Sequence, residues 1–182
     1  LCLEGLKRHT AYPDLEVIVV DNGSTDARLK QVLKDNAREL DLYRIVDSAG
    51  FNFSRLVNRG ASRATGEILL LLNDDVAALE QGWLHRLVES ATRQSIGAVG
   101  ARLIYPDRTI QHAGVALGVG GGFGHLWKGA PEEAASANPY ISLPGSRSAV
   151  TAACLAVRRD AFDRVSGFDE QFAVALNDID FC

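Results

Sequence analysis

The sequence contains no methionine and only three cysteines, Cys2, Cys154 and Cys182, among its 182 residues. Because translation starts at methionine, we expect the sequence to be part of a longer protein that is cut at both ends. An odd number of widely spaced cysteines fits neither a disulfide framework nor a zinc site. We therefore expect reduced thiols and a cytoplasmic protein, with peripheral attachment of the full-length protein to the inner face of the membrane as an open alternative.

Long apolar runs are missing as well. The longest one, Ile68 to Leu72, has the length of a strand, whereas a membrane span needs about 20 such residues. No charged start followed by an apolar stretch marks a signal peptide. The formal net charge of -4 gives no basic surface of the kind that binds nucleic acid. We expect no membrane span in this part of the protein and no nucleic-acid partner.

Short apolar runs alternate with amphipathic stretches in the first half of the chain. The runs predict strands at residues 16–20, 42–46, 67–72 and 98–104, and helical spacing of apolar residues predicts helices at 27–40, 54–64 and 82–92. Such alternation is typical of right-handed βαβ units. We therefore predict one α/β domain with an open, mostly parallel sheet flanked by helices.

The second half of the chain has a different composition. Residues 118–124 include five glycines, and residues 130–148 are rich in Pro, Ala, Ser and Gly. We interpret the latter stretch as a long, mobile loop that covers the sheet. A strand at 149–157, a short helix at 160–165 and an acidic loop complete the prediction.

Polar residues follow two of the predicted strands directly. Asp21 and Asn22 come after the first strand, and Asn73, Asp74 and Asp75 come after the third. In an open parallel sheet, ligands bind at the carboxyl ends of the strands. Carboxylates there either bind a hard cation such as Mg²⁺ or Mn²⁺, or accept hydrogen bonds from a ribose. The alternative is that they only cap helices or end strands.

A third acidic cluster lies near the end of the sequence. Asp178 and Asp180 are two residues apart, so they would not face each other on a helix. We predict separate roles for them, one as a general base and the other as a cap or ion-pair partner.

The four histidines, His9, His85, His112 and His125, show no metal-ligand spacing. His112 and His125 could approach the ligand-binding edge at the carboxyl ends of the strands, but we favour a structural role for both. The glycine run at 118–124 lacks the strand-then-helix setting of a phosphate-binding loop.

Five stretches, in this order, resemble the family 2 glycosyltransferases, which have the GT-A fold. They are residues 15–26 (LEVIVVDNGSTD), 51–60 (FNFSRLVNRG), 64–75 (ATGEILLLLNDD), 167–172 (GFDEQF) and 177–182 (NDIDFC). The resemblance covers nearly the whole chain. It implies an inverting glycosyltransferase that moves a sugar from a nucleotide-diphosphate donor to a hydroxyl of a saccharide or lipid-linked acceptor, in polysaccharide or glycoconjugate assembly.

The resemblance also implies a role for each matching polar residue. Asp21 and Asn22 stand where the family contacts the nucleobase and ribose, and Asn52 lies in a stretch that helps to hold the nucleotide. Asp74 would contact the ribose. Asp75 would ligate the Mg²⁺ or Mn²⁺ ion that bridges the diphosphate.

Asp178 matches the catalytic base of the family. The preceding residue is Asn177 where members commonly have Glu, and Asn22 stands where many have Asp. Members usually carry a further strand before the helix that begins near Leu1, and a further region after Asp178. We therefore expect the chain to be a catalytic domain that lacks its first strand and its C-terminal part, and that is inactive by itself.

Two other classes of protein remain open at this point. A sugar nucleotidyltransferase would have the same α/β sheet and an acidic metal site as a glycosyltransferase. The segment around Asp178 is evidence against this alternative. A non-catalytic module that binds a sugar nucleotide is the other alternative, and Asn177 keeps it open.

Overall fold

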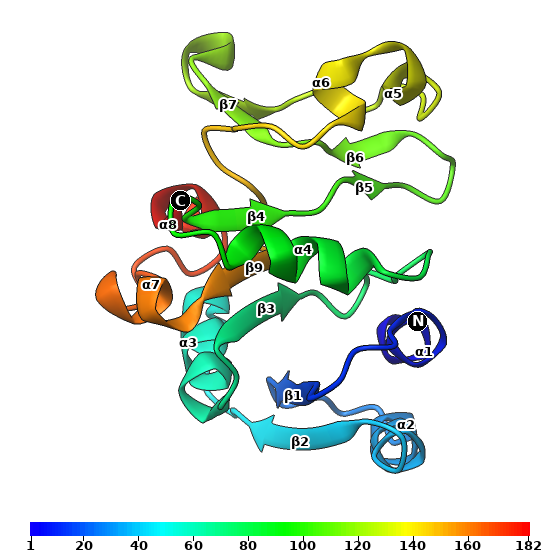
Figure 1. Ribbon diagram of the computed structural model, residues 1–182. Coiled ribbons are helices and arrows are strands. Elements are labelled where there is room, and N and C mark those ends of the chain that lie inside the picture. Colours follow the sequence, from blue (N-terminus) through cyan, green and yellow to red (C-terminus); the bar gives the residue numbers. More distant parts are fainter.

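The computed structural model describes the backbone of residues 1–182 and the side chains of all of them except positions 120 and 136, which fall in the glycine run and in the predicted covering loop (Figure 1). The elements are α1 (Cys2–His9), β1 (Glu16–Asp21), α2 (Arg28–Asn36), β2 (Asp41–Val46), α3 (Phe53–Arg63), β3 (Ile68–Leu72), α4 (Trp83–Ala91), β4 (Ala98–Gly100), β5 (Leu103–Ile104), β6 (Ile110–His112), β7 (Val115–Leu117), η1 (Val119–Gly121), β8 (Phe123–His125), α5 (Ala134–Ala137), α6 (Pro139–Ser142), β9 (Cys154–Arg158), α7 (Arg159–Arg164) and α8 (Asn177–Phe181).

The strands β1, β2, β3, β4 and β9 form two separate sheets. β1 and β2 pair in parallel, with Asp21 opposite Val46 at their ends. β9 lies between β3 and β4 and is antiparallel to both, so that Leu155 faces Leu71 on one side and Gly100 on the other. The strand that completes this sheet therefore comes from far along the sequence.

β9 is buried on both faces, and its side chains divide between two apolar clusters. Leu155 and Val157 pack with Phe162 and Phe168 in a cluster to which α3 contributes. The alternate residues of β9 pack on the other face against Leu87 and its neighbours in α4. This period of two is what a central strand requires, and it fixes helices on both faces of the sheet.

The segments from β5 to α6 form an upper part of the molecule in Figure 1, beyond β4. Two antiparallel hairpins, β5–β6 and β7–β8, build this part. Its small core consists of Ile110, Ala135 and Ile141, with the indole of Trp127 packed against them. Residues 130–148, predicted as a loop, thus contain two short helices, of which α6 begins at a proline and is capped by Asn138.

The strands expected at 16–20, 42–46 and 67–72 and the three helices of the first half are confirmed, but the sheet is more mixed than their alternation predicted. The single strand expected at 98–104 is wrong. β4 pairs with β9 only over Ala98–Gly100, and the chain then forms a separate strand, β5, that pairs with β6. The acidic C-terminal loop is also wrong in part, since α8 forms there. The three cysteines are free in the structure.

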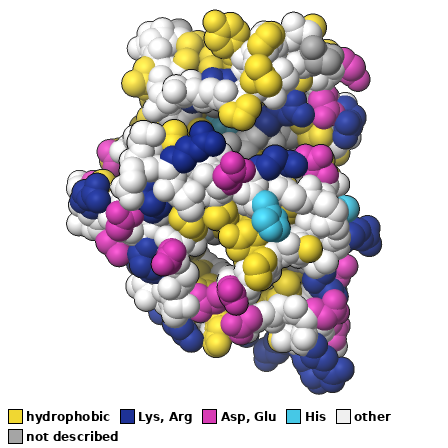
Figure 2. Space-filling view, in the orientation of Figure 1, with side chains coloured by type: hydrophobic (Ala, Val, Ile, Leu, Met, Phe, Trp, Pro, Cys, Tyr) yellow, Lys and Arg dark blue, Asp and Glu magenta, His cyan; other side chains and the backbone are white. Residues whose placement is uncertain are grey.

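Lys and Arg side chains are interspersed with Asp and Glu over the face shown in Figure 2. The hydrophobic side chains of this face gather in its upper part and around a hollow lower down. Within the described residues, no helix is both long and apolar enough to cross a membrane.

We predict that Gly167→Ala destabilises the fold by about 1–3 kcal/mol. Gly167 has a φ of +74°, and a Cβ there would lie 2.5 Å from Oδ1 of Asn58, the atom that accepts the N–H of Phe168. Denaturant unfolding measures the change. Gly97→Ala is the control because a Cβ there meets nothing within 4 Å; equal stability of the two variants would contradict the prediction.

Candidate active site

Asp21 is the last residue of β1, and only 4% of it is exposed. One carboxylate oxygen accepts the backbone N–H of Ser24 at 2.8 Å, and the other accepts the Nε and Nη2 groups of Arg44 from the neighbouring strand. The hydrogen bonds from Ser24 and Arg44 lower the pKa of Asp21 to about 2. This carboxylate is therefore fully occupied by protein donors.

Asp47, which follows β2, is a second buried carboxylate that the sequence did not single out. It is 2% exposed and forms ion pairs with Arg59 at 2.6 Å and Arg55 at 3.3 Å. These two guanidinium groups lower its pKa to about 2. The signal in the sequence was an Asp directly after a predicted strand, followed by two arginines four residues apart in the next helix.

The side chains of Asn22 and Asn52 form hydrogen bonds to neighbouring loops. The Nδ2 group of Asn22 donates to the carbonyls of Asp47 and Ala49, each at 2.8 Å, which joins the loops after β1 and β2. Asn52 caps α3, because its Oδ1 accepts the N–H of Arg55 at 3.0 Å. Its Nδ2 donates to the carbonyl of Glu170 at 2.8 Å. Both asparagines thus shape the surface on which a ligand would rest.

Asp74 and Asp75 form a turn directly after β3 and are both exposed. Burial raises the pKa of the Cys2 thiol, the positive N-terminus lowers it, and the negative charges of Asp74 and Asp75 raise it. Neither side chain has an ion pair or hydrogen bond to the rest of the described chain. They differ in this from Asp21, whose oxygens are already bound.

Within the described residues, no group of three or more His, Cys, Asp or Glu side chains is assembled to hold a metal ion. The exposed oxygens of Asp74 and Asp75 nevertheless suit a hard cation. Mg²⁺ is typically bound by one or two carboxylates, with substrate phosphates and water completing its shell. The residues present therefore fit a divalent ion that arrives together with a diphosphate.

Asp178 lies in the first turn of α8 and is half-buried. Its Oδ2 accepts the backbone N–H of Ala152 at 3.3 Å. The next residue, Ala153, accepts the N–H of Asn73 at 3.0 Å through its carbonyl. The 151–153 segment thus ties Asp178 to the turn that carries Asp74 and Asp75.

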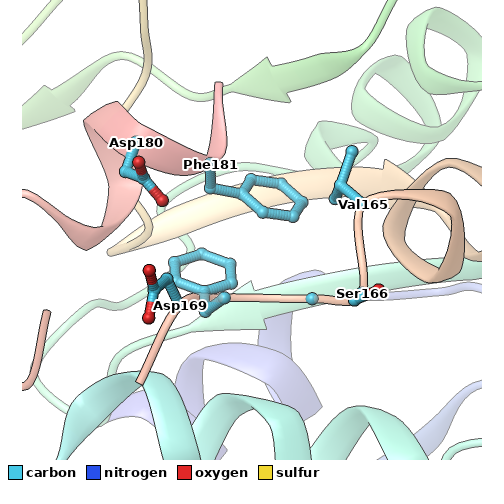
Figure 3. A pocket seen from close by; sticks show the side chains of 7 residues that line it. Val165, Ser166, Asp169, Asp180 and Phe181 are labelled. Atoms are coloured by element: carbon cyan, nitrogen blue, oxygen red, sulfur yellow. The ribbon is translucent and has the colours of Figure 1, made fainter. Parts of the chain in front are cut away.

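Asp180 points to a different place, as its spacing from Asp178 predicted. It lines the larger cavity, of about 430 Å³, where Phe181 and Phe168 stack and Asp169 stands opposite (Figure 3). None of the predicted donor-binding or metal-binding residues lines this cavity. A smaller cavity of about 210 Å³ lies against the 151–153 segment.

The predicted residues thus form two groups. Asp21 and Asn22 are joined to Asp47 by the loops after β1 and β2, whereas Asp178 is joined to the turn at Asp74 by the 151–153 segment. No hydrogen bond within the described residues links one group to the other. Asn52 is connected to the first group through Arg55, which pairs with Asp47, and it is also bonded to the loop at Glu170.

Residues 1–165 match the family model described as Glycosyl transferase family 2. The chain belongs to this family. The recognition made from the five sequence stretches is therefore confirmed, and a glycosyltransferase is favoured over a sugar nucleotidyltransferase. The individual roles assigned to the site residues stay predictions.

The relatives include much longer proteins. The chain is 42% identical to the uncharacterized protein y4gI of Sinorhizobium fredii, with 99% of the chain and 20% of that protein covered. It is 36% identical to the O-antigen biosynthesis protein RfbC of Myxococcus xanthus, with 98% and 14% covered. It is 26% identical to the N-acetylglucosaminyl-diphospho-decaprenol L-rhamnosyltransferase of Mycobacterium tuberculosis, with 98% and 62% covered. The chain thus spans a fifth or less of the first two.

Two solved structures share the fold. The mannosyltransferase PcManGT from Pyrobaculum calidifontis, in complex with GDP-Man and Mn²⁺, aligns with a TM-score of 0.67 at 19% identity over 98% of this chain and 45% of that one. GalNAc-T7 with UDP, GalNAc and Mn²⁺ aligns with a TM-score of 0.69 at 15% identity over 96% and 34%. The GT-A fold implied by the sequence is confirmed.

We predict that Asp47→Asn lowers the free energy of unfolding at pH 7. The variant should also lose less of this free energy than the wild type does as the pH falls. The folded pKa of about 2 lies below the usual value near 3.9. The ionised carboxylate therefore stabilises the fold above about pH 4, and this contribution disappears as the pH falls toward 2. Denaturant unfolding at several pH values measures both effects.

Asp163→Asn is the matched control, because Asp163 is exposed and should leave the pH profile unchanged. A profile of Asp47→Asn that coincides with that of this control would show that the buried ion pairs contribute nothing.

Proposed function

We propose that the chain is the catalytic domain of an inverting glycosyltransferase that takes its sugar from a nucleotide-diphosphate donor and needs Mg²⁺ or Mn²⁺. One observation carries the proposal. The turn at Asp74 and Asp75 keeps two exposed carboxylates without protein partners, and the 151–153 segment links this turn to Asp178.

The donor would lie across the carboxyl ends of β1 and β3. Asp75 would bind the cation together with the donor phosphates, and Asp74 would accept from the ribose. The nucleobase and ribose would rest on the loops after β1 and β2, which Asp21 holds through Arg44 and Asn22 holds through its hydrogen bonds to the loop after β2. A bound divalent ion would neutralise the charge that develops on the leaving diphosphate.

Asp178 would act as the general base on the opposite side of the sugar. One of its oxygens accepts the N–H of Ala152, which leaves the other for the acceptor hydroxyl. As the acceptor oxygen bonds to the anomeric carbon, the bond from that carbon to the diphosphate breaks and the hydroxyl proton passes to Asp178. A single displacement of this kind inverts the anomeric configuration and releases a nucleoside diphosphate.

The comparisons support the donor class and the setting. PcManGT and GalNAc-T7 were solved with Mn²⁺ and with GDP-Man or UDP. RfbC is named for O-antigen biosynthesis, and the mycobacterial relative for a diphospho-decaprenol acceptor. We therefore propose a role in polysaccharide or glycoconjugate assembly, with a saccharide or lipid-linked acceptor and with residues 130–148 contributing to its selection.

We predict that Asp75→Ala weakens the binding of UDP, dTDP or GDP in the presence of Mn²⁺ at least about tenfold, or 1.4 kcal/mol, because the carboxylate that holds the cation is gone. Isothermal titration calorimetry measures the affinity. Asp163→Ala removes an exposed carboxylate elsewhere and serves as the control. If Asp75→Ala binds these nucleotides in Mn²⁺ as tightly as the wild type does, Asp75 is not the metal ligand.

We predict that Asp178→Asn lowers kcat about 10²–10⁴-fold while donor affinity stays within a few-fold of the wild type, because an amide cannot take the acceptor proton. The rate is measured on the full-length protein that contains this chain, as released nucleoside diphosphate. Asp180→Asn is the matched control, since that side chain lines the separate cavity of Figure 3. Equal turnover of Asp178→Asn and wild type would mean that Asp178 is not the base. No turnover with any donor by the full-length wild-type protein that contains this chain would favour a non-catalytic binding module.

A further inference from the structure

The smaller cavity, of about 210 Å³, contains a pair of histidines that the proposed transfer does not use. His112, at the end of β6, is 2% exposed, whereas His125, at the end of β8, is exposed. Their Nδ1 atoms lie 2.9 Å apart. We call this cavity the His112 pocket; its polar lining consists of Tyr105, Gln111, His112, His125, Lys128 and Thr151.

The hydrogen bonds assign the protons of both rings. The backbone N–H of Thr151 can only donate, and it lies 3.3 Å from Nε2 of His112, so this nitrogen is the acceptor. A neutral His112 then carries its proton on Nδ1 and donates it to Nδ1 of His125. His125 therefore carries its own proton on Nε2, where it is free to donate to a ligand.

His112 stays neutral at physiological pH. Burial, followed by the nearby His125 and Arg147, lowers its pKa to about 4. A neutral His112 keeps its Nδ1 proton directed at His125, which holds the second ring in one tautomer and one orientation. His112 is thus a positioning residue, and His125 is the group that faces the ligand.

The pocket offers donors and positive charge but no carboxylate among its described lining residues. Lys128 brings an ammonium group. The hydroxyl oxygen of Thr151 already accepts the N–H of Ala153 at 3.3 Å, so its proton is available to a ligand. A saccharide presents hydroxyls that need acceptors, whereas a phosphate only accepts and binds most strongly to charged donors. This set of groups favours a phosphate.

The position of the pocket places such a phosphate beside the proposed transfer site. Thr151 and Ala153 line the pocket, while Ala152 between them donates to Asp178. Ala153 also accepts the N–H of Asn73, before the acidic turn. The pocket therefore shares a wall with both groups that would carry out the transfer.

We propose that the His112 pocket binds a phosphate group of a substrate, with Lys128 and the Nε2–H of His125 as donors and His112 as the residue that orients His125. Its volume is below the roughly 300 Å³ at which pockets begin to enclose whole ligands, so it takes the phosphate and leaves the remainder of the ligand outside. The inference deepens the proposed function and rests on it for the substrate that carries the phosphate, which is either the donor or a phosphorylated acceptor.

Calorimetry with inorganic pyrophosphate in EDTA tests the pocket without the metal site. We expect the wild type to bind pyrophosphate, Lys128→Gln to bind it about tenfold more weakly, and the exposed-lysine control Lys34→Gln to match the wild type. Asp75→Ala should also match the wild type, which separates this site from the proposed metal site. No binding to the wild type, or equal binding by Lys128→Gln, would overturn the proposal.

A second titration, with a nucleoside diphosphate and Mn²⁺, identifies the substrate. If Lys128→Gln also weakens this binding about tenfold, the phosphate belongs to the donor; if the binding is unchanged, it belongs to the acceptor. Absence of Mn²⁺-dependent nucleotide binding in the wild type, with pyrophosphate binding intact, would reject the proposed function and leave the pocket standing.

Nitrogen-15 NMR of the histidine rings tests the role of His112 without a variant. We expect His125 to be held as the Nε2–H tautomer and His112 as the Nδ1–H tautomer at pH 7. A mixture of tautomers at His125, as in a free imidazole, would overturn the positioning role.

Discussion

The antiparallel insertion of β9 between β3 and β4 is the constraint on which the rest of the structure depends. Leu155 and Val157 are almost completely buried, and burial of each such side chain contributes roughly 1.5–3 kcal/mol. Because both edges of β9 are paired, its register cannot slip without moving each of its side chains to the opposite face. The 151–153 segment, which leads into β9, is held in place by this register.

That segment explains how distant parts of the sequence meet. Its backbone contacts His112 through Thr151, Asp178 through Ala152 and Asn73 through Ala153. Three consecutive residues thus connect the upper part of the molecule, the C-terminal helix and the acidic turn. The side chains of residues 151–153 take no part in these three contacts, because the segment contributes only backbone N–H and carbonyl groups to them.

Local patterns in the sequence predicted what depends on neighbours along the chain. The apolar run of β1, the helical spacing of α3 and the polar residues after the strands all placed elements correctly. The antiparallel orientation of β9 could not be predicted in this way, because its partner strands lie more than 50 residues away in the sequence. An apolar run fits a buried parallel strand and a buried antiparallel strand equally well. The ion pairs of Asp47 and the contact of His112 with His125 likewise exist only after folding brings separate elements together.

The carboxylates near the proposed site are of two kinds, those already bound by protein donors and those without protein partners among the described residues. Asp21 and Asp47 are buried, and their oxygens are bound by arginines and backbone donors. These two carboxylates therefore stabilise the loops after β1 and β2. Asp74 and Asp75 are exposed and have no such partners in the described part of the chain. Two adjacent carboxylates that repel each other and lack protein counter-charges are best satisfied by a cation from outside. A site built in this way is rigid where it would recognise the nucleotide and incomplete where it would bind the metal, so ligand and ion would enter together.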